Sequence, residues 1–470
     1  MIPRWQPVVK TKASVLFQWF VFEGHRQPYF NKSIGLDFGL RNQKIVADEV
    51  SIDLNEFSIL EKLLEARVKA DPQFIDKFIN RCYQYSNQLL NTSKEVRGNT
   101  LSADLFLRYQ NSVLHLMPFL NTILVMDTIL KKFITSLFSS ELGITKPSNQ
   151  DELLTKLLIP QKKSLFVQET EMIFKIAVKI QQDTRADVSM DIKQYLENFS
   201  WIPVIAYYGN FSTEEEVRQR LIKLVKENPL EKIKQSLAVK KETETNYRRA
   251  LNSIKHCPRL LNLISLSQEL LYLQTYRLDV FFLAYYHSYP MFEQIAKFLN
   301  SSPQDIVFHT GPEIVDLIKA KSRLDQNEIN RRKECYALIL EDDKFTLISG
   351  KSARPILGPQ TDQTIVRGSV ANRGRATGTA RLVFSVEDMK KVSTGDIIIS
   401  TNTIPQLVPA MIKSAGIITD VGGMLSHAAI VSRELGLPCI VGTRNATKIF
   451  KDGDLVELNA YEGVARKVGT

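Results

Sequence analysis

The chain has 470 residues, 44% of them hydrophobic and 24% charged, which is the composition of an ordinary globular protein. Its length exceeds what one hydrophobic core usually organises, so we expect two or three domains. The net charge of +10 is spread along the chain, without a dense basic run interleaved with aromatic residues. Composition and charge therefore argue against nucleic-acid binding.

Cysteine and histidine spacing indicates neither a disulfide framework nor a metal site. The four cysteines lie far apart and form no Cys-x-x-Cys pair, so we expect buried reduced thiols and a cytoplasmic location; they are Cys82, Cys257, Cys335 and Cys439. Five of the six histidines are interpreted as surface residues or satisfied core residues: His25, His115, His256, His287 and His309. No bound metal is expected.

Residues 1–54 are expected to form a small β-containing segment. The apolar run 14–22 is rich in aromatic and β-branched residues, which favours a strand, with residues 44–52 as a possible partner. A signal peptide is the less favoured alternative, because the run is short, contains Gln18 and lacks a following small-residue cleavage site.

Residues 55–350 are predicted to form a large, mainly helical domain that ends in a β-hairpin. Apolar residues recur at three- and four-residue spacing in the segments 55–69, 72–90, 103–139, 151–158, 163–181, 191–199, 213–227, 232–254 and 258–298. Thr310 and Glu313 have the spacing of a capping box. The strongly apolar stretch 114–138 is interrupted by polar residues and Pro118, so we expect a buried helix and no membrane span.

A hairpin and a linker are expected to close this part of the chain. The runs 335–340 and 344–348 read as two strands joined by acidic turn residues. Residues 351–363 show no sustained period and contain Pro355, Gly358 and Pro359, which is typical of a linker.

The segment from Gly416 to Gly442 reads as a buried strand, a glycine turn, a helix and a second strand. The turn holds Gly422 and Gly423, and the helix is expected to open at His427 with Ser426 as its cap. Gly436 gives the helix a plausible end. Residues 416–420 and 439–441 are the two expected strands.

A histidine in the first helical turn beside two glycines is well placed to accept a phosphoryl group. Imidazole is an uncharged nucleophile near neutral pH, and the positive helix end disfavours its protonation while favouring an attached phosphate. The absence of side chains at Gly422 and Gly423 would let a partner's phosphate-binding surface approach closely. The alternative is an ordinary α/β unit in which His427 is a polar residue at a helix start.

From about Thr364 to the end, the chain resembles the mobile phosphohistidine domain of the PEP-utilising enzymes. This family includes PEP synthase, pyruvate phosphate dikinase, enzyme I of the sugar phosphotransferase system and rifampicin phosphotransferase. The matching stretches, in the family's order and spacing, are 368–378, 395–399, 405–411, 419–433, 438–442 and 452–454. One departure is Leu425, where many members carry threonine, so a threonine-directed regulation known in plant-type dikinases would have no acceptor there.

The resemblance implies that His427 is the phosphorylated residue and that residues 364–470 form a swivelling β/β/α domain. The expected fold class is thus multidomain, α plus α/β, with the helical domain first. Family members work by relay: an ATP-grasp domain phosphorylates the histidine, and a second active site takes the phosphoryl group. Residues 1–54 are too few for an ATP-grasp domain, and the helical region has the wrong period. No chain follows Thr470 to form a PEP barrel, so we expect a stand-alone member.

Two functions follow from this interpretation. In the first, the chain is a transferase component that carries phosphate on His427 between a separate ATP-grasp kinase, which would hold ATP and Mg, and an unknown acceptor in the helical domain. In the second, it is a non-catalytic binding or regulatory module that keeps the mobile-domain fold. Neither a nucleic acid nor a membrane is expected as a partner.

For three further charged residues, the sequence leaves two roles open. Arg433 lies two helical turns after His427, where a role in docking a partner and a surface salt bridge are equally compatible with the sequence. Arg277 and Asp279 lie inside an apolar segment and could face an acceptor pocket, although a buried structural pair is the commoner arrangement.

Overall fold

The structure is a computed structural model that describes residues 5–10, 12–97, 99–159, 161–204, 206–226, 228–320, 322, 325–357, 365–385, 387–403, 407–422, 426–443 and 445–468. The chain divides into two compact units. One, called here the helical unit, comprises Lys12–Arg41 and Asn55–Lys333. The other, the sheet-containing unit, comprises Met1–Thr11, Asn42–Leu54 and Glu334–Thr470.

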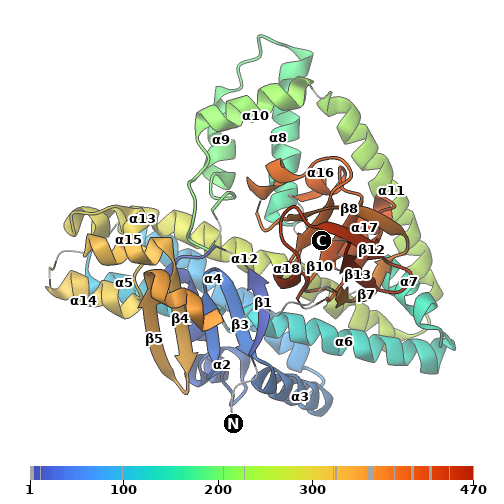
Figure 1. Ribbon diagram of the computed structural model, residues 1–470, viewed down its shortest axis with the longest axis horizontal. Coiled ribbons are helices and arrows are strands. Elements are labelled where there is room, and N and C mark those ends of the chain that lie inside the picture. Colours follow the sequence, from blue (N-terminus) through green and yellow to red (C-terminus); the bar gives the residue numbers. More distant parts are fainter. Residues whose placement is uncertain are drawn as a thin grey trace. The chain divides into compact units, whose positions relative to one another are not determined.

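The helical unit is built from long helices, as the apolar spacing predicts (Figure 1). The helices that begin before residue 143 are α1 Val15–Gly24, α2 Gln27–Ile34, α3 Leu54–Ala70, α4 Phe74–Arg97, α5 Ala103–Leu116 and α6 Phe119–Leu142. Those that follow are α7 Pro147–Leu157, α8 Leu165–Gln182, α9 Ser189–Phe199, α10 Glu214–Lys226, α11 Pro229–Ser253, α12 Pro258–Phe298, α13 Pro303–Ile306, α14 Gly311–Ala320 and α15 Gln326–Glu334. The predicted helical segments are confirmed with shifted ends, apart from 103–139, which is divided into two helices.

The central helix of this unit is α12, which packs most extensively against α4 and α6. Its buried side chains include Leu270, Leu273, Phe281 and Phe292. The buried residues of α12 recur at helical spacing along its 41 residues, so one face of the helix stays inside the unit throughout.

The segment predicted as one helix over 103–139 is two helices, α5 and α6. Pro118 lies between them, and because proline has no backbone N–H it interrupts the helical hydrogen-bond ladder. By length and composition, Ala103–Leu142 is the one candidate membrane span among the described residues, but 78% of its most apolar window is buried inside the protein. That burial is the arrangement of a core helix, as expected from the sequence.

The strand predicted over residues 14–22 is wrong, because these residues form the helix α1. Ser14 caps the helix, its Oγ accepting from the Phe17 backbone N–H at 3.1 Å. Eight of the ten α1 residues are buried. A helix buried on nearly every side has no polar face, so its sequence lacks the helical period and resembles a buried strand.

Residues 43–53 do form a β-hairpin, but its neighbours in the sheet are segments other than residues 14–22. The strands β1 Trp5–Lys10, β2 Gln43–Val46, β3 Glu49–Asp53, β4 Tyr336–Glu341 and β5 Lys344–Ser349 form one antiparallel sheet in the order β1-β3-β2-β4-β5. The predicted hairpin at 335–348 is confirmed, and Asp342 and Asp343 in its turn have φ of +46° and +64°. Because β2 pairs with β4, segments from both ends of the chain share this sheet.

The expected boundaries at residues 54 and 350 therefore differ from the division that the structure has. Residues 12–41 belong to the helical unit, and the hairpin at 336–349 belongs with residues 43–53. The expected linker 351–363 begins within the 3₁₀ helix η1 Gly350–Leu357, whose Ala353 is buried against Val46 and Ala337. The remaining linker residues, 358–363, lie outside the described residues.

The C-terminal domain, residues 365–468, has its own eight-stranded sheet in the order β6-β13-β12-β8-β9-β10-β11-β7. The strands are β6 Ile365–Arg367, β7 Ser369–Asn372, β8 Arg375–Leu382, β9 Ile397–Ser400, β10 Gly416–Thr419, β11 Cys439–Val441, β12 Leu455–Asn459 and β13 Val464–Lys467. Strands β8, β9, β10 and β11 pair in parallel. The helical elements are η2 Glu387–Lys391, α16 Val408–Met411, α17 His427–Glu434 and α18 Ala446–Ile449.

Two hydrophobic cores hold this domain together. One contains Ile399 and Ile418 of the sheet with Ile449 and Phe450 of α18 and the residue after it. The other contains Ile398 and Ile417 with residues of α16 and α17. Neighbouring residues of β9 and β10 point to opposite faces, so the sheet is covered on both sides, as a parallel sheet requires.

Candidate functional site

The candidate site lies after the carboxyl ends of the parallel strands β9 and β10. The pairing continues past both strands, since Asp420 N–H donates to the Ser400 carbonyl at 3.0 Å and Val421 N–H to the Thr401 carbonyl at 2.8 Å. The chain then turns at Gly422, which has φ of +126°. A Cβ on Gly422 would lie 2.9 Å from the Ser426 side chain, so both the backbone conformation and the close approach require glycine.

Helix α17 begins at His427, as the sequence predicts. Ser426 Oγ accepts from the Ala429 backbone N–H at 3.4 Å, which is the expected capping contact. At the other end Gly436 has φ of +68°, and Leu437 N–H donates to the Ser432 carbonyl at 2.8 Å. This is the hydrogen bond of a glycine-terminated helix. His427 therefore stands at the first helical position, where free backbone N–H groups gather.

Of the predicted site residues, the structure brings together Gly422, Ser426 and the backbone of His427. Gly423 lies outside the described residues, and so do the side chains of His427 and Arg433. Arg433 is placed on the same helix, one residue before its end. The roles of these residues in phosphoryl chemistry remain predictions.

Asp420 is a structural residue of the site that sequence reasoning missed. Its carboxylate accepts from Thr443 Oγ1 at 3.0 Å and from the Thr447 backbone N–H at 3.2 Å, and Thr447 Oγ1 also donates to it. Burial raises the pKa of Asp420, and the hydrogen bonds from Thr447 and Thr443 oppose that rise. Asp420 thus connects the end of β10 to the chain after β11, and its position directly after a buried strand was the available signal.

Two buried hydroxyl groups near the turn have no hydrogen-bond partner among the described residues. They belong to Thr419, which is fully buried, and Thr401. Thr419 Oγ1 would lie 3.7 Å from a Cβ on Gly422, which places this hydroxyl at the turn. A buried hydroxyl without a hydrogen-bond partner costs folding free energy.

The described residues contain no group of three histidine, cysteine or acidic side chains that could hold a metal ion. All four cysteines are free and buried, as expected from their spacing. His25, His115 and His309 are buried and hydrogen-bonded, to the Met117 carbonyl, Ser33 Oγ and the Asp305 carbonyl respectively, so they are satisfied core residues.

Arg277 and Asp279 do not form the buried pair that the sequence suggests. Arg277 is buried, and its guanidinium donates to backbone carbonyls, one of them that of Leu120 at 2.7 Å. Asp279 Oδ2 is buried without a hydrogen-bond partner among the described residues. Their spacing of two residues points the side chains away from each other on a helix, which accounts for the separate environments.

Comparison with known proteins gives a match to the C-terminal domain. The family described as "PEP-utilising enzyme, mobile domain" matches residues 392–463. The phosphoenolpyruvate synthase of Pyrococcus furiosus is 46% identical over 186 residues, covering 37% of this chain and 22% of that protein. A probable phosphoenolpyruvate synthase of Methanothermobacter thermautotrophicus is 37% identical over 150 residues, covering 29% and 22%.

The rifampicin phosphotransferase of Bacillus cereus is 31% identical over 170 residues, covering 34% of this chain and 18% of that protein. This chain thus matches about a fifth of the length of these relatives. Residues 364–470 make up about 23% of the chain, so the similarity to the Pyrococcus furiosus and Bacillus cereus proteins extends beyond them. Residues 392–463 of the C-terminal domain are therefore similar to the mobile domain of the PEP-utilising enzymes.

Proposed function

We propose that this chain is a phosphotransferase component in which His427 carries a phosphoryl group from a separate ATP-grasp kinase to an acceptor. The observation that carries the proposal is the mobile-domain match over residues 392–463, in which His427 opens a capped helix after the Gly422 turn. ATP and Mg would bind to the kinase subunit. The names of the relatives, phosphoenolpyruvate synthase and rifampicin phosphotransferase, support phosphoryl transfer as the class of reaction.

The chemistry proceeds in two displacements. A ring nitrogen of His427 attacks the transferred phosphorus in line, forming an N–P bond while the donor's P–O bond breaks. An acceptor hydroxyl or water then attacks the same phosphorus, and the electron pair of the N–P bond returns to the imidazole. The helix N-terminus stabilises the dianionic phosphohistidine, and the Thr419 hydroxyl is near enough to the turn to assist.

A hinged carrier gains rate from tethering. Because the C-terminal domain has its own sheet and cores, it can move as a body between donor and acceptor sites at a high effective concentration. The alternative is a non-catalytic binding or regulatory module, and the well-formed capped helix at His427 favours the carrier.

The test is transfer of label from [β-32P]ATP in the presence of an ATP-grasp kinase encoded beside this chain. We expect acid-labile, base-stable label on the wild type and none on His427→Ala. As the matched control, His256→Ala removes an exposed histidine of the helical unit and should keep the full label. An unlabelled wild type with an active kinase would contradict the carrier function, and label surviving in His427→Ala would contradict the choice of residue.

A further inference from the structure

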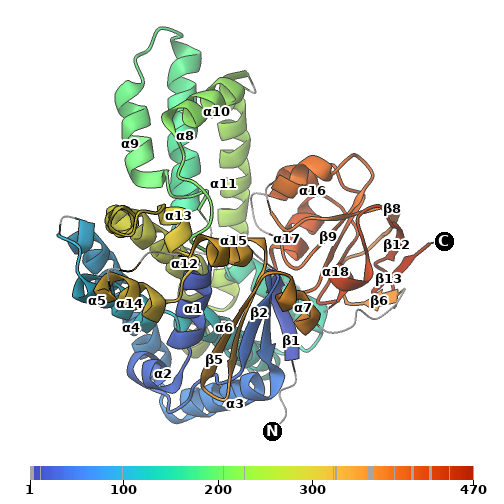
Figure 2. The same cartoon turned by 60° about the vertical axis from the view of Figure 1, so that its left-hand side comes forward.

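The helical unit contains a cleft of about 810 Å³. Figure 2 shows α8 and α9 rising side by side beyond α12, and the cleft is lined by residues of these helices together with the end of α4. Its apolar lining includes Leu165, Met172, Phe199 and Leu283. The volume is in the range of small-molecule sites, which is roughly 300–1,000 Å³. Ten of the fifteen lining residues are polar or charged, and the other five are apolar.

Two of the lysines that line the cleft have no acidic partner among the residues that the structure describes. Lys179 is paired with Asp191 at 2.8 Å, and Glu171 is paired with Lys163 at 2.6 Å. Lys94 and Lys175, by contrast, form no ion pair or hydrogen bond with any described residue. Their charges can therefore bind an anionic group, whereas the charge of Lys179 is already paired with Asp191.

His287 of α12 also lines this cleft, unlike the histidines of the core. Its Nδ1 lies 3.4 Å from Ser93 Oγ, which leaves Nε2 for another partner. Burial, together with the nearby charges of Lys94 and Arg97, lowers the pKa of His287 to about 4. The other charged residues around the cleft are Glu171, Lys175, Lys179, Asp191 and Glu197. The imidazole is thus uncharged at neutral pH and able to accept a proton.

We propose that this cleft binds the phosphoryl acceptor, a small alcohol or phenol with an apolar or aromatic frame, with His287 as its general base. The inference rests on the proposed function of His427. The acceptor oxygen forms the new P–O bond, the N–P bond of phosphohistidine breaks, and the hydroxyl proton moves to His287 Nε2. Lys94 and Lys175 neutralise the phosphoryl oxygens, and the apolar side chains hold the frame.

The same lysines adjust the strength of the base. While the cleft lacks an anion, the positive charge beside His287 opposes protonation of the ring. An arriving phosphoryl group offsets that charge, so the imidazole becomes more basic at the stage when the proton has to leave the acceptor.

The test uses phenyl phosphate, an aromatic phosphomonoester that resembles the expected product, and the full-length chain. Calorimetry should show binding that weakens about tenfold or more in the double variant Lys94→Ala/Lys175→Ala, since charge-assisted contacts to phosphate are lost. Lys193→Ala, which removes an exposed lysine of α9 outside the cleft lining, should bind as the wild type does. Inorganic phosphate, which lacks the frame, should bind about tenfold more weakly than phenyl phosphate.

Nitrogen-15 NMR of the histidine rings, with His287 assigned through His287→Gln, follows the base directly. Phenyl phosphate should raise the pKa of His287 by about one unit or more, and the lysine double variant should lose this response. Equal binding by the double variant, equal binding of inorganic phosphate, or an unchanged His287 titration would each overturn the assignment. Phenyl phosphate binding to the cleft and labelling of His427 from ATP are separate measurements on the wild type, so a failure of the cleft is distinguishable from a failure of His427 to accept label.

Discussion

At the scale of single residues, Asp279 of α12 is a carboxyl group whose pKa burial changes strongly. One of its carboxylate oxygens is buried without a hydrogen-bond partner among the described residues. Burial raises the pKa of Asp279 to about 7, although a hydrogen bond from the Leu165 backbone N–H opposes the rise. The folded protein therefore keeps this carboxyl protonated over a pH range in which the unfolded chain has already released the proton.

The raised pKa of Asp279 makes the free energy of unfolding depend on pH. Because the unfolded chain binds fewer protons between about pH 4 and pH 7, the free energy of unfolding falls as the pH rises through this range. Asp279→Asn removes the titration, so the variant should exceed the wild type in stability near pH 8 by up to about 4 kcal/mol and match it more closely near pH 5. Urea unfolding at the two pH values measures the difference.

The control is Asp316→Asn, which changes an exposed aspartate of α14 and should keep the wild-type pH dependence. An Asp279→Asn variant whose stability follows that of the wild type at both pH values would mean that this carboxyl is ionised in the folded protein.

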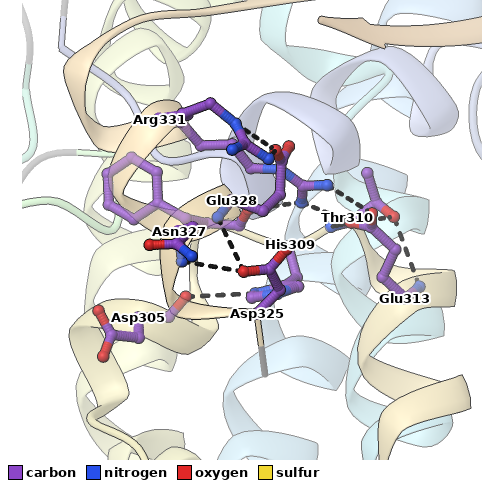
Figure 3. Close-up of polar contacts among 10 residues, drawn as sticks. Asp305, His309, Thr310, Glu313, Asp325, Asn327, Glu328 and Arg331 are labelled. Atoms are coloured by element: carbon purple, nitrogen blue, oxygen red, sulfur yellow. Dashed lines mark hydrogen bonds and ion pairs between the residues drawn. The ribbon is translucent and has the colours of Figure 1, made fainter. Parts of the chain in front are cut away.

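At the scale of elements, two helices of the helical unit start with the same capping box in different surroundings. In α14, Glu313 accepts from the Thr310 backbone N–H at 2.7 Å (Figure 3). In α10, Glu216 accepts from the Thr213 backbone N–H at 2.8 Å and is exposed. Only Glu313 also pairs with a buried arginine, since Arg332 of α15 donates to both of its carboxylate oxygens, at 2.8 and 2.9 Å.

Comparing these two capping boxes separates the stability that a helix cap contributes from the stability that the ion pair with buried Arg332 contributes. Glu216→Ala should cost about 0.5–1 kcal/mol of unfolding free energy, the usual effect of a lost cap. Glu313→Ala should cost about 2–3 kcal/mol, because Arg332 loses one of its two carboxylate partners, the other being Glu328, while it stays buried. Chemical unfolding measures both, and equal losses would show that the Arg332 contact adds nothing to the cap.

At the scale of the whole molecule, the two sheets differ in how far apart in the sequence their strands lie. The eight-stranded sheet and both cores of the C-terminal domain use only residues after 364. The five-stranded sheet combines residues 5–10 and 43–53 with 336–349, nearly three hundred residues later. The first can form from a continuous segment, and the second cannot.

Fragments test this difference. Residues 365–470 should unfold cooperatively when expressed alone, and residues 1–357, which hold all five strands of the other sheet, should do so too. Residues 55–357 lack β1, β2 and β3, so β4 loses its pairing to β2 and the fragment should aggregate or melt without cooperativity. Thermal unfolding followed by circular dichroism distinguishes the cases, and a cooperative transition for 55–357 would contradict the role given to the shared sheet.

Elements with local signals were predictable from residue types and spacing. The cap at Ser426, the glycine end at Gly436 and the strands on either side of α17 lie where residue types and spacing predict them. The long helices follow from apolar spacing for the same reason, since both signals depend on hydrogen bonds and faces within one element.

Features that depend on contacts between distant segments could not be predicted in this way. The helix α1 is buried on nearly all sides and so carries no period, the shared sheet needs β2 beside β4, and Asp420 gains its partners from the chain after β11. The cleft beside His287 likewise arises because α4, α8, α9 and α12 meet there. Such arrangements follow from packing and burial across the fold, which the spacing of residues along the chain does not encode.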